Sequence, residues 1–209
     1  MAKTLPNIQY STESSRSIVD SPDALYKLQF EKNEEYYSNL ESKVRFLKGC
    51  EKLVRIDDRY RKYIFLLKKK CKLNKCQVLS KLTDQDCTIE MHHGPIFTLY
   101  DYAEIISDYH IDRGDDITTF DIANEILDLH WDHKIQVVML SSSMHEEVHK
   151  REIFINLQQA WGDLHGFLEK YPLGADLKEK YNRYVDKSAM LDSTTRDILK
   201  LNDELFRNM

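Results

Sequence analysis

The chain has 209 residues, of which 42% are hydrophobic and 31% charged, and its formal net charge is −5 at pH 7. This size allows one well-packed core with an extension, and the acidic balance excludes a protein that binds nucleic acid over its whole surface. No apolar run approaches the roughly 18 residues of a membrane span, and the first residues lack the apolar stretch and cleavage site of a secretory signal. We therefore expect a cytoplasmic protein with no membrane contact, whose four cysteines are free thiols.

The first 75 residues divide into a tail and a basic helical region. Residues 1–20 are polar and are predicted to be disordered. A helix is predicted to begin at Ser21-Pro22-Asp23, where Ser is an N-cap and Pro takes the first helical position, and to break at Gly49. A second helix is predicted from about Asp57 to Lys70, because apolar residues recur there with helical spacing. Residues 21–75 together form the predicted basic helical region.

Residues 76–171 are predicted to form the core of the fold, and residues 172–209 a helical extension. Strand and helix patterns alternate in the core, with Thr118 and Ser141 as helix caps. Besides the helix that Ser141 caps, the predicted elements are two short strands, two amphipathic helices, a β-branched strand and a long helix: Cys76–Leu79, Thr88–Met91, Leu99–Tyr109, Thr119–His133, Lys134–Leu140 and Ile153–Lys170. The extension carries two polar helices, which start near Asp176 and Ser193. The sequence therefore predicts a mainly α-helical α+β protein.

Four of the eight histidines lie in two short segments. His92 and His93 end a predicted strand, and His145 and His149 lie on the helix that Ser141 caps. Residues four apart share one helix face, about 6 Å apart along the axis, so His145 and His149 can bind one ion together with His92. Adjacent strand residues point to opposite faces, so one residue of the His92-His93 pair is the candidate ligand and the other the candidate general base. A metal ion beside a neutral imidazole is suited to phosphodiester hydrolysis.

These segments resemble a known family. The runs CTIEMHHGPIFTLYDYAEI, VVMLSSSMHEEVHKREIFIN and QAWGDL are similar to HNH endonucleases encoded by bacteriophages, and the order of the histidines resembles the ββα-metal motif of the colicin DNase toxins. The resemblance covers about residues 87–165. It implies a ββα-metal (HNH) nucleus in which His92, His145 and His149 hold the metal and His93 is the general base. It also implies an enzyme of the host cytoplasm that cuts double-stranded DNA.

The chain departs from the family pattern in several places. Gln136 stands where the second strand of the motif usually carries Asn, and its longer amide either steadies the base or marks a weakened enzyme. Two predicted helices are inserted between the histidine pair and the second strand, and no CxxC precedes the helical histidines, which excludes the zinc-knuckle subtype. Glu90 is interpreted as a solvent-face residue, with orientation of a metal ligand as the alternative.

Residues 43–75 carry 13 Lys and Arg against three Asp and Glu, a net charge of +10. Such a patch attracts a phosphate backbone within a Debye length of roughly 10 Å, although a lysine-rich helix face is more often only solvated. The predicted contacts to double-stranded DNA are Arg59, Arg61, Lys62, Lys68, Lys69, Lys70 and Lys72. The expected cofactor is one divalent metal ion, Mg²⁺ in the cell. Zn²⁺, Mn²⁺ and Ni²⁺ are alternatives, because three imidazoles bind zinc or nickel more tightly.

The sequence thus predicts a metal-dependent HNH endodeoxyribonuclease, and two alternatives are open. The first is a catalytically idle HNH fold that serves as a DNA-binding or assembly module with a structural metal. The second is a structural or regulatory phage protein that uses the histidines for a structural metal and its helical ends for contacts with a partner. The C-terminal helices are then the candidate site for a protein partner or a second copy of the chain. The other four histidines, His110, His130, His133 and His165, are expected to be half-buried or on the surface, and Trp131 and Trp161 to lie in the core.

Overall fold

The computed structural model describes residues 39–190, which form a mainly helical fold with one two-stranded antiparallel sheet. Its elements are, in chain order, α3 (Leu40–Ile56), α4 (Asp58–Lys69), β1 (Ile89–His93), α5 (Leu99–Asp112), α6 (Thr119–Trp131), β2 (Val137–Ser141), α7 (Ser142–His149), the 3-10 helix η1 (Leu157–Gln159), α8 (Leu164–Leu168) and helical residues 175–190. The predicted α+β class, mainly α-helical, is confirmed. The predicted tail and the helices expected to start at Ser21 and near Ser193 lie outside the described residues. Within residues 39–190, no helix combines the length and apolar composition needed to cross a bilayer.

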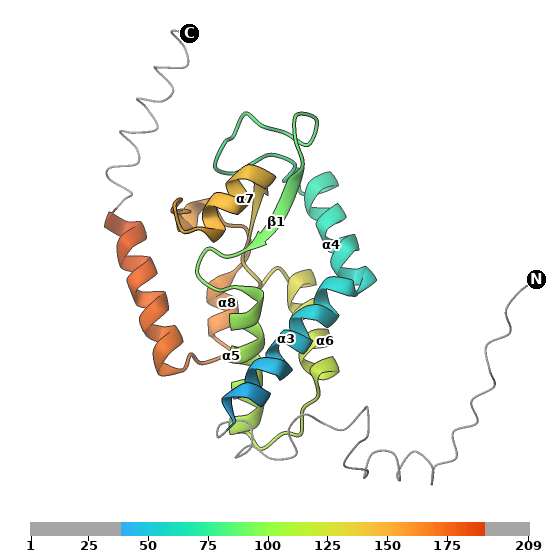
Figure 1. Ribbon diagram of the computed structural model, residues 1–209, viewed down its shortest axis with the longest axis vertical. Coiled ribbons are helices and arrows are strands. Elements are labelled where there is room, and N and C mark those ends of the chain that lie inside the picture. The colour runs from blue at the N-terminus through green and yellow to red at the C-terminus, as the bar shows by residue number, and fades with distance from the viewer. Residues whose placement is uncertain (1–38, 191–209) are drawn as a thin grey trace, which may run out of the picture.

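Helices α3 to α6 pack against one another on one side of the sheet (Figure 1). Each of α5 and α6 begins with a capping box, Thr98 with Asp101 and Thr118 with Asp121, in which side chain and backbone satisfy each other's hydrogen bonds. The predicted Thr118 cap and both helices are confirmed. Their buried faces share one apolar core with α3, α4, β1 and β2. The small sheet therefore packs against these four helices through the shared apolar core.

Gly49 lies inside α3, so the predicted helix break at this residue is wrong. The buried residues Phe46, Cys50 and Val54 recur with helical spacing across it, and their burial favours an uninterrupted helix. The missing side chain allows a close approach, because a Cβ atom at Gly49 would lie 3.2 Å from Thr119 Cγ2 of α6. The glycine therefore serves helix packing instead of ending the helix.

The two strands pair in antiparallel register from Ile89 opposite Ser141 to His93 opposite Val137. Helices α5 and α6 separate them in the sequence, and α7 packs on both strands. The predicted strand at Cys76–Leu79 is wrong, since this segment forms turns with no strand. Gln77 in this segment is hydrogen-bonded to the backbone of Met139 in β2. Its N–H donates to Met139 O at 2.8 Å, and its side-chain Oε1 accepts from Met139 N at 2.6 Å.

The long helix predicted over Ile153–Lys170 is also wrong. Trp161 and Val137 exchange two backbone hydrogen bonds of 2.8 Å, so this part of the chain adds a single bridge to β2. The next residue, Gly162, has φ +121°, and a Cβ atom there would lie 2.5 Å from Ile135 O. Only glycine adopts this backbone conformation at so close an approach without strain. The pairing with a strand distant in sequence therefore overrides the helical pattern.

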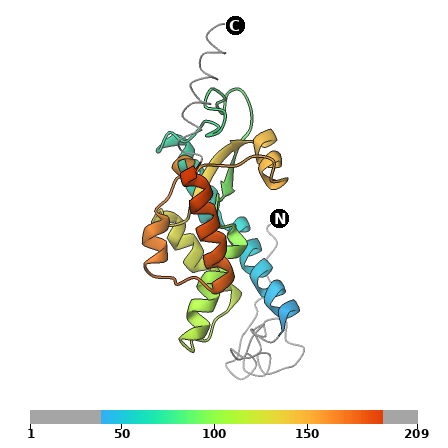
Figure 2. The ribbon, with the colours of Figure 1, turned by 90° about the vertical axis from the view of Figure 1, so that its left-hand side faces the viewer.

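Helical residues 175–190 lie along one side of the molecule (Figure 2). The Tyr181 ring stacks on Phe97 with centroids 6.4 Å apart, and Lys180 forms a 2.7 Å ion pair with Asp101 at the start of α5. Tyr184 Oη donates to Ile155 O at 2.7 Å. The helix expected near Asp176 is thus present and packs on its own chain.

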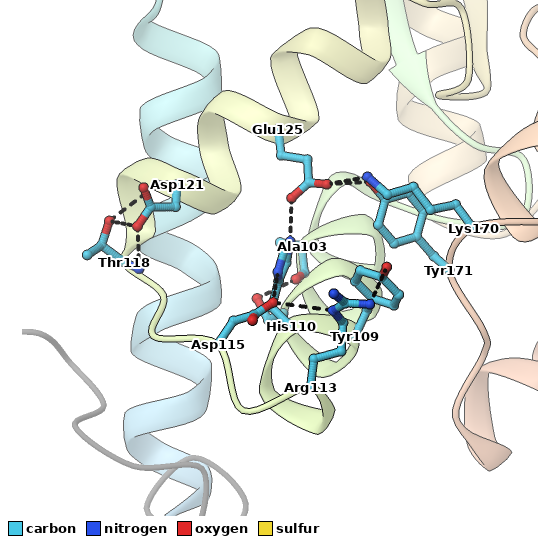
Figure 3. Close-up of polar contacts among 11 residues, drawn as sticks. Ala103, Tyr109, His110, Arg113, Asp115, Thr118, Asp121, Glu125, Lys170 and Tyr171 are labelled. Atoms are coloured by element: carbon cyan, nitrogen blue, oxygen red, sulfur yellow. Dashed lines mark hydrogen bonds and ion pairs between the residues drawn. The ribbon is translucent and has the colours of Figure 1, made fainter.

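A polar network joins α5, α6 and the residues after α8 (Figure 3). His110 Nδ1 lies 2.8 Å from Asp115 Oδ2, and its Nε2 lies 2.6 Å from Glu125 Oε2. The other oxygen of Glu125 accepts from Lys170 Nζ at 2.8 Å and from Tyr171 Oη at 2.5 Å. Glu125 therefore connects three segments through one half-buried carboxylate.

Candidate metal centre

Strand β1 places alternate side chains on its two faces. Ile89, Met91 and His93 are buried, whereas Glu90 and His92 lie on the half-buried face. This alternation follows from the pleat of a strand, in which residues two apart share a face. The predicted separation of His92 from His93 is confirmed, and Glu90 shares the face of His92.

Helix α7 follows β2 directly and presents two histidines to that face. Ser141 caps its first turn, as predicted, by accepting from Met144 N. His145 and His149 lie one turn apart, with their Nε2 atoms separated by 3.0 Å. The His92 ring centroid lies 5.0 Å from that of His145 and 5.1 Å from that of His149. The three imidazoles therefore converge from a strand and a helix.

The potential ligand atoms of His92, His145 and His149 all lie within 4.8 Å of one another. A tetrahedral zinc ion about 2.0–2.1 Å from each nitrogen requires nitrogens roughly 3.4 Å apart, so small side-chain adjustments would let all three bind one ion. No fourth His, Cys, Asp or Glu from residues 39–190 joins the group. The three residues fit an ion held by three imidazoles, with water or a group from elsewhere as a further ligand.

The electrostatics at His92 favour its neutral imidazole. Burial, together with the neighbouring His145 and His149, lowers the pKa of His92 to about 4. His92 is consequently uncharged at neutral pH, and a lone pair on its ring is available to a cation. At neutral pH a metal ion therefore does not have to displace a proton from His92.

Glu90 contacts the histidine group through His145. Its Oε2 lies 2.5 Å from His145 Nδ1, and its Oε1 accepts from Ser142 Oγ at 2.9 Å. Hydrogen bonds from His145 and Ser142 lower the pKa of the Glu90 carboxyl. The Glu90 side chain is 40% exposed, as expected of a solvent-face residue, and its contacts also fit the alternative that it orients a ligand.

His93 lies on the opposite face of β1, inside the core. Its Nε2 is 3.0 Å from Nε2 of His130, and its ring stacks on Tyr60. Burial, and secondarily His130, lower the pKa of His93 well below its usual value. The structure thus does not bring the predicted base into the group of three histidines.

His130 and Trp131 differ from their predicted positions. His130 is completely buried, where a half-buried or surface position was expected, and Trp131 is 38% exposed, where a core position was expected. Both lie on the last turn of α6, where adjacent residues point in different directions around the helix. Periodicity alone did not fix which of the two faces the core.

Gln136, the second predicted catalytic residue, precedes β2 and is buried. Its N–H donates to Tyr102 Oη at 3.0 Å and its carbonyl accepts from Gly94 N at 3.3 Å. Its side-chain Oε1 has no hydrogen-bond partner among residues 39–190. The hydrogen bonds of the Gln136 backbone are with Tyr102 and Gly94, and its predicted catalytic role stays a prediction.

Four of the seven predicted DNA contacts have partners within the protein. Arg59 binds Asp57 and Asp128, Arg61 binds Asp58, Lys69 binds Asp84, and Lys68 Nζ donates to Ile89 O. The other three, Lys62, Lys70 and Lys72, are exposed. Internal pairing reduces the charge that this segment presents to a phosphate backbone. DNA binding by these residues stays a prediction.

Residues 6–209 match the family model of Bacteriophage G278-like virion protein. The chain belongs to this family.

Searches of curated proteins and of solved structures find no match for it. The resemblance to HNH endonucleases, and with it the function of a metal-dependent HNH endonuclease, is therefore corrected: the virion family accounts for residues 6–209, whereas the resemblance covered only about residues 87–165. The phage origin that it implied is confirmed. Histidines at ligand spacing indicate a possible metal site, but the geometry of that site does not specify a reaction.

Proposed function

We propose that this chain is a structural protein of the phage particle, in which one divalent transition-metal ion bound by His92, His145 and His149 joins β1 to α7. The family match over residues 6–209 carries the structural role. The convergence of three imidazoles within 4.8 Å supports the metal. This is the second alternative considered from the sequence, a structural phage protein whose histidines hold a structural metal.

The local fold gives such an ion a stabilising task. A sheet of two five-residue strands is marginal by itself. Helix α7 has only eight residues and none of them is buried, and so short a helix is unstable without tertiary contacts. An ion that binds His92 on β1 and two histidines on α7 crosslinks these weak elements, much as metals stabilise small domains.

The donor set favours zinc or nickel over magnesium. Mg²⁺ prefers an octahedral shell of oxygen ligands and keeps several waters, whereas imidazole suits Zn²⁺ and Ni²⁺. The expectation of Mg²⁺ was part of the HNH endonuclease interpretation, which the family match contradicts. We therefore propose zinc as the first ion to test.

Two measurements test the proposal. Immunoblotting of gradient-purified phage particles should detect the chain as a component of the particle, and its absence from pure particles would refute the structural role. Elemental analysis of the chain after loading with zinc should show one zinc per chain. Calorimetric titration of the metal-free chain should show zinc binding and no comparable binding of magnesium. His149→Ala should abolish binding, while His165→Ala, a variant of a histidine on α8 that is 88% exposed, should retain it. Equal binding by both variants would refute the metal site.

A further inference from the structure

The Glu90 carboxylate makes one contact with each of the first two turns of α7. Its Oε2 faces His145 Nδ1 at 2.5 Å, and its Oε1 accepts from Ser142 Oγ at 2.9 Å. The Ser142 N–H also donates to Thr88 O at 3.2 Å, so the start of α7 is hydrogen-bonded to the beginning of β1. These contacts join the same two elements that the proposed ion would join.

We propose that Glu90 is a positioning residue for the metal site, which fixes the tautomer and ring orientation of His145 and raises the affinity of the site for zinc. This inference rests on the metal site proposed above. Glu90 is no ligand in this arrangement, because its oxygens are directed to His145 Nδ1 and Ser142. It acts on the ion through the imidazole between them.

The chemistry of the contact determines the tautomer. An ionised carboxylate only accepts hydrogen bonds, so His145 Nδ1 must carry the proton. In the neutral imidazole the lone pair is then on Nε2, the atom that lies 3.0 Å from His149 Nε2. The carboxylate thus directs the free lone pair of His145 toward the other ligands. A negative charge behind the ring also makes that nitrogen a stronger donor to a cation.

The register of β1 explains why one strand supplies both functions. Glu90 and His92 are two residues apart, so they share a strand face, and α7 packs over it. His92 contributes a ligand directly, and Glu90 orients a ligand contributed by α7. A shift of one residue in the strand register would place both side chains on the opposite face and remove both contributions.

The competing explanation is that Glu90 and His145 form a structural ion pair without relation to metal. Such a pair would affect the stability of the metal-free chain, and it would leave zinc affinity and the coordination of the ion unchanged. Partly exposed pairs of this kind contribute little. Metal affinity and a spectrum of the bound ion therefore separate the two explanations.

The experiment uses the full chain and three variants: Glu90→Gln, Glu90→Ala and, as control, Glu146→Gln. Glu146 lies next to His145 on α7, is exposed, and loses the same charge on substitution to Gln. Zinc affinity is measured by competition with a chromophoric chelator. Cobalt substitution gives the visible spectrum of the bound ion, and ¹⁵N NMR of the zinc-free chain gives the tautomer of His145.

Loss of a residue that orients a metal-bound histidine typically costs about 10- to 100-fold in metal affinity. We expect Glu90→Ala to lie in this range with an altered cobalt spectrum and a mixed His145 tautomer. Glu90→Gln, which keeps an acceptor oxygen, should lose less, and Glu146→Gln should stay within about twofold of the parent chain. The Gln variant keeps the test valid if Glu90→Ala does not fold.

The two proposals fail in different ways. A parent chain that binds no zinc overturns the metal site itself. A parent chain that binds zinc while Glu90→Ala and Glu90→Gln bind it equally well, with unchanged spectra, overturns only the role of Glu90. An equal loss of affinity in Glu146→Gln would also overturn it, because general charge would then explain the effect.

Discussion

His93 and His130 face each other in the core with their Nε2 atoms 3.0 Å apart. His130 Nδ1 lies 2.7 Å from Ile126 O and must donate to that carbonyl, so its Nε2 accepts a hydrogen bond from the Nε2–H of His93. One hydrogen thus satisfies two buried rings, as long as neither ring is charged. Burial lowers the pKa of His130 to about 4 and that of His93 in the same direction.

The first prediction is a loss of stability on acidification. Since the folded-state pKa of His130 is about 4 and its ordinary value is 6.5, the unfolded chain binds more protons between these values. The free energy of unfolding should be highest above pH 6.5 and fall by up to about 3 kcal/mol from His130 as the pH approaches 4. Urea unfolding in the presence of EDTA at pH 7, 5.5 and 4.5 measures this.

The double variant His93→Leu/His130→Leu provides the comparison. Its free energy of unfolding should depend less on pH over the same interval. Part of the dependence should persist, because the pKa of His92 is also lowered to about 4. A double variant whose pH dependence equals that of the parent chain would show that the buried pair is not responsible.

The second prediction concerns the response of α7 to metal. Because none of its eight residues is buried, its amide hydrogens should exchange quickly in the metal-free chain and slowly with zinc bound. Hydrogen exchange followed by mass spectrometry should locate the protection in β1 and α7, with little change in α5 and α6. Protection spread evenly over all helices would contradict a local crosslink.

The third prediction concerns Gly162. A methyl group there would lie 2.5 Å from Ile135 O, and φ is +121°. We expect Gly162→Ala to destabilise the chain by roughly 2 kcal/mol or more, by adding backbone strain and separating Trp161 from Val137. Gly174→Ala is the matched control, since a methyl group there meets nothing within 4 Å. Equal melting temperatures for the two variants would refute this account.

The fourth prediction tests the polar network of Glu125. Glu125→Ala removes the acceptor of Lys170 and Tyr171 and the carboxylate facing His110, and should cost roughly 1–3 kcal/mol in the free energy of unfolding. Asp128→Ala on the same helix removes a 72% exposed carboxylate paired with Arg59 and should cost about 0.5 kcal/mol or less. Chemical denaturation of both variants makes the comparison, and the reverse order would contradict it.

Local signals in the sequence were enough to predict much of the helical framework. Apolar periodicity and the Thr118 cap predicted α4, α5 and α6, and β-branched residues predicted β2 to within three residues at its start. Helical spacing placed His145 and His149 on one face, and strand alternation separated His92 from His93. In each of these cases the deciding information lies within one turn or one strand, whereas the grouping of His92 with the helical pair came from the order of the motif.

The failures share a different cause, because they depend on partners distant in sequence. Trp161 pairs with Val137 instead of continuing a helix, and Gln77 binds Met139. Glu90 meets His145 across 55 residues, a contact that no local pattern specifies. The nature of the protein could not be inferred from the histidine motifs either, since a ligand set constrains the ion and leaves its use undetermined.

The register of the sheet also constrains the order of folding. Ile89 pairs with Ser141, and all of α5 and α6 lies in the loop between them. Closing a loop of this length before the helices form would cost chain entropy that one short strand pair does not recover. We therefore expect the helices to form first and bring the strands together, so that His92 meets His145 and His149 late. In this order, an ion binds after most of the fold has formed. It then slows the separation of β1 from α7 during unfolding and takes no part in the nucleation of folding.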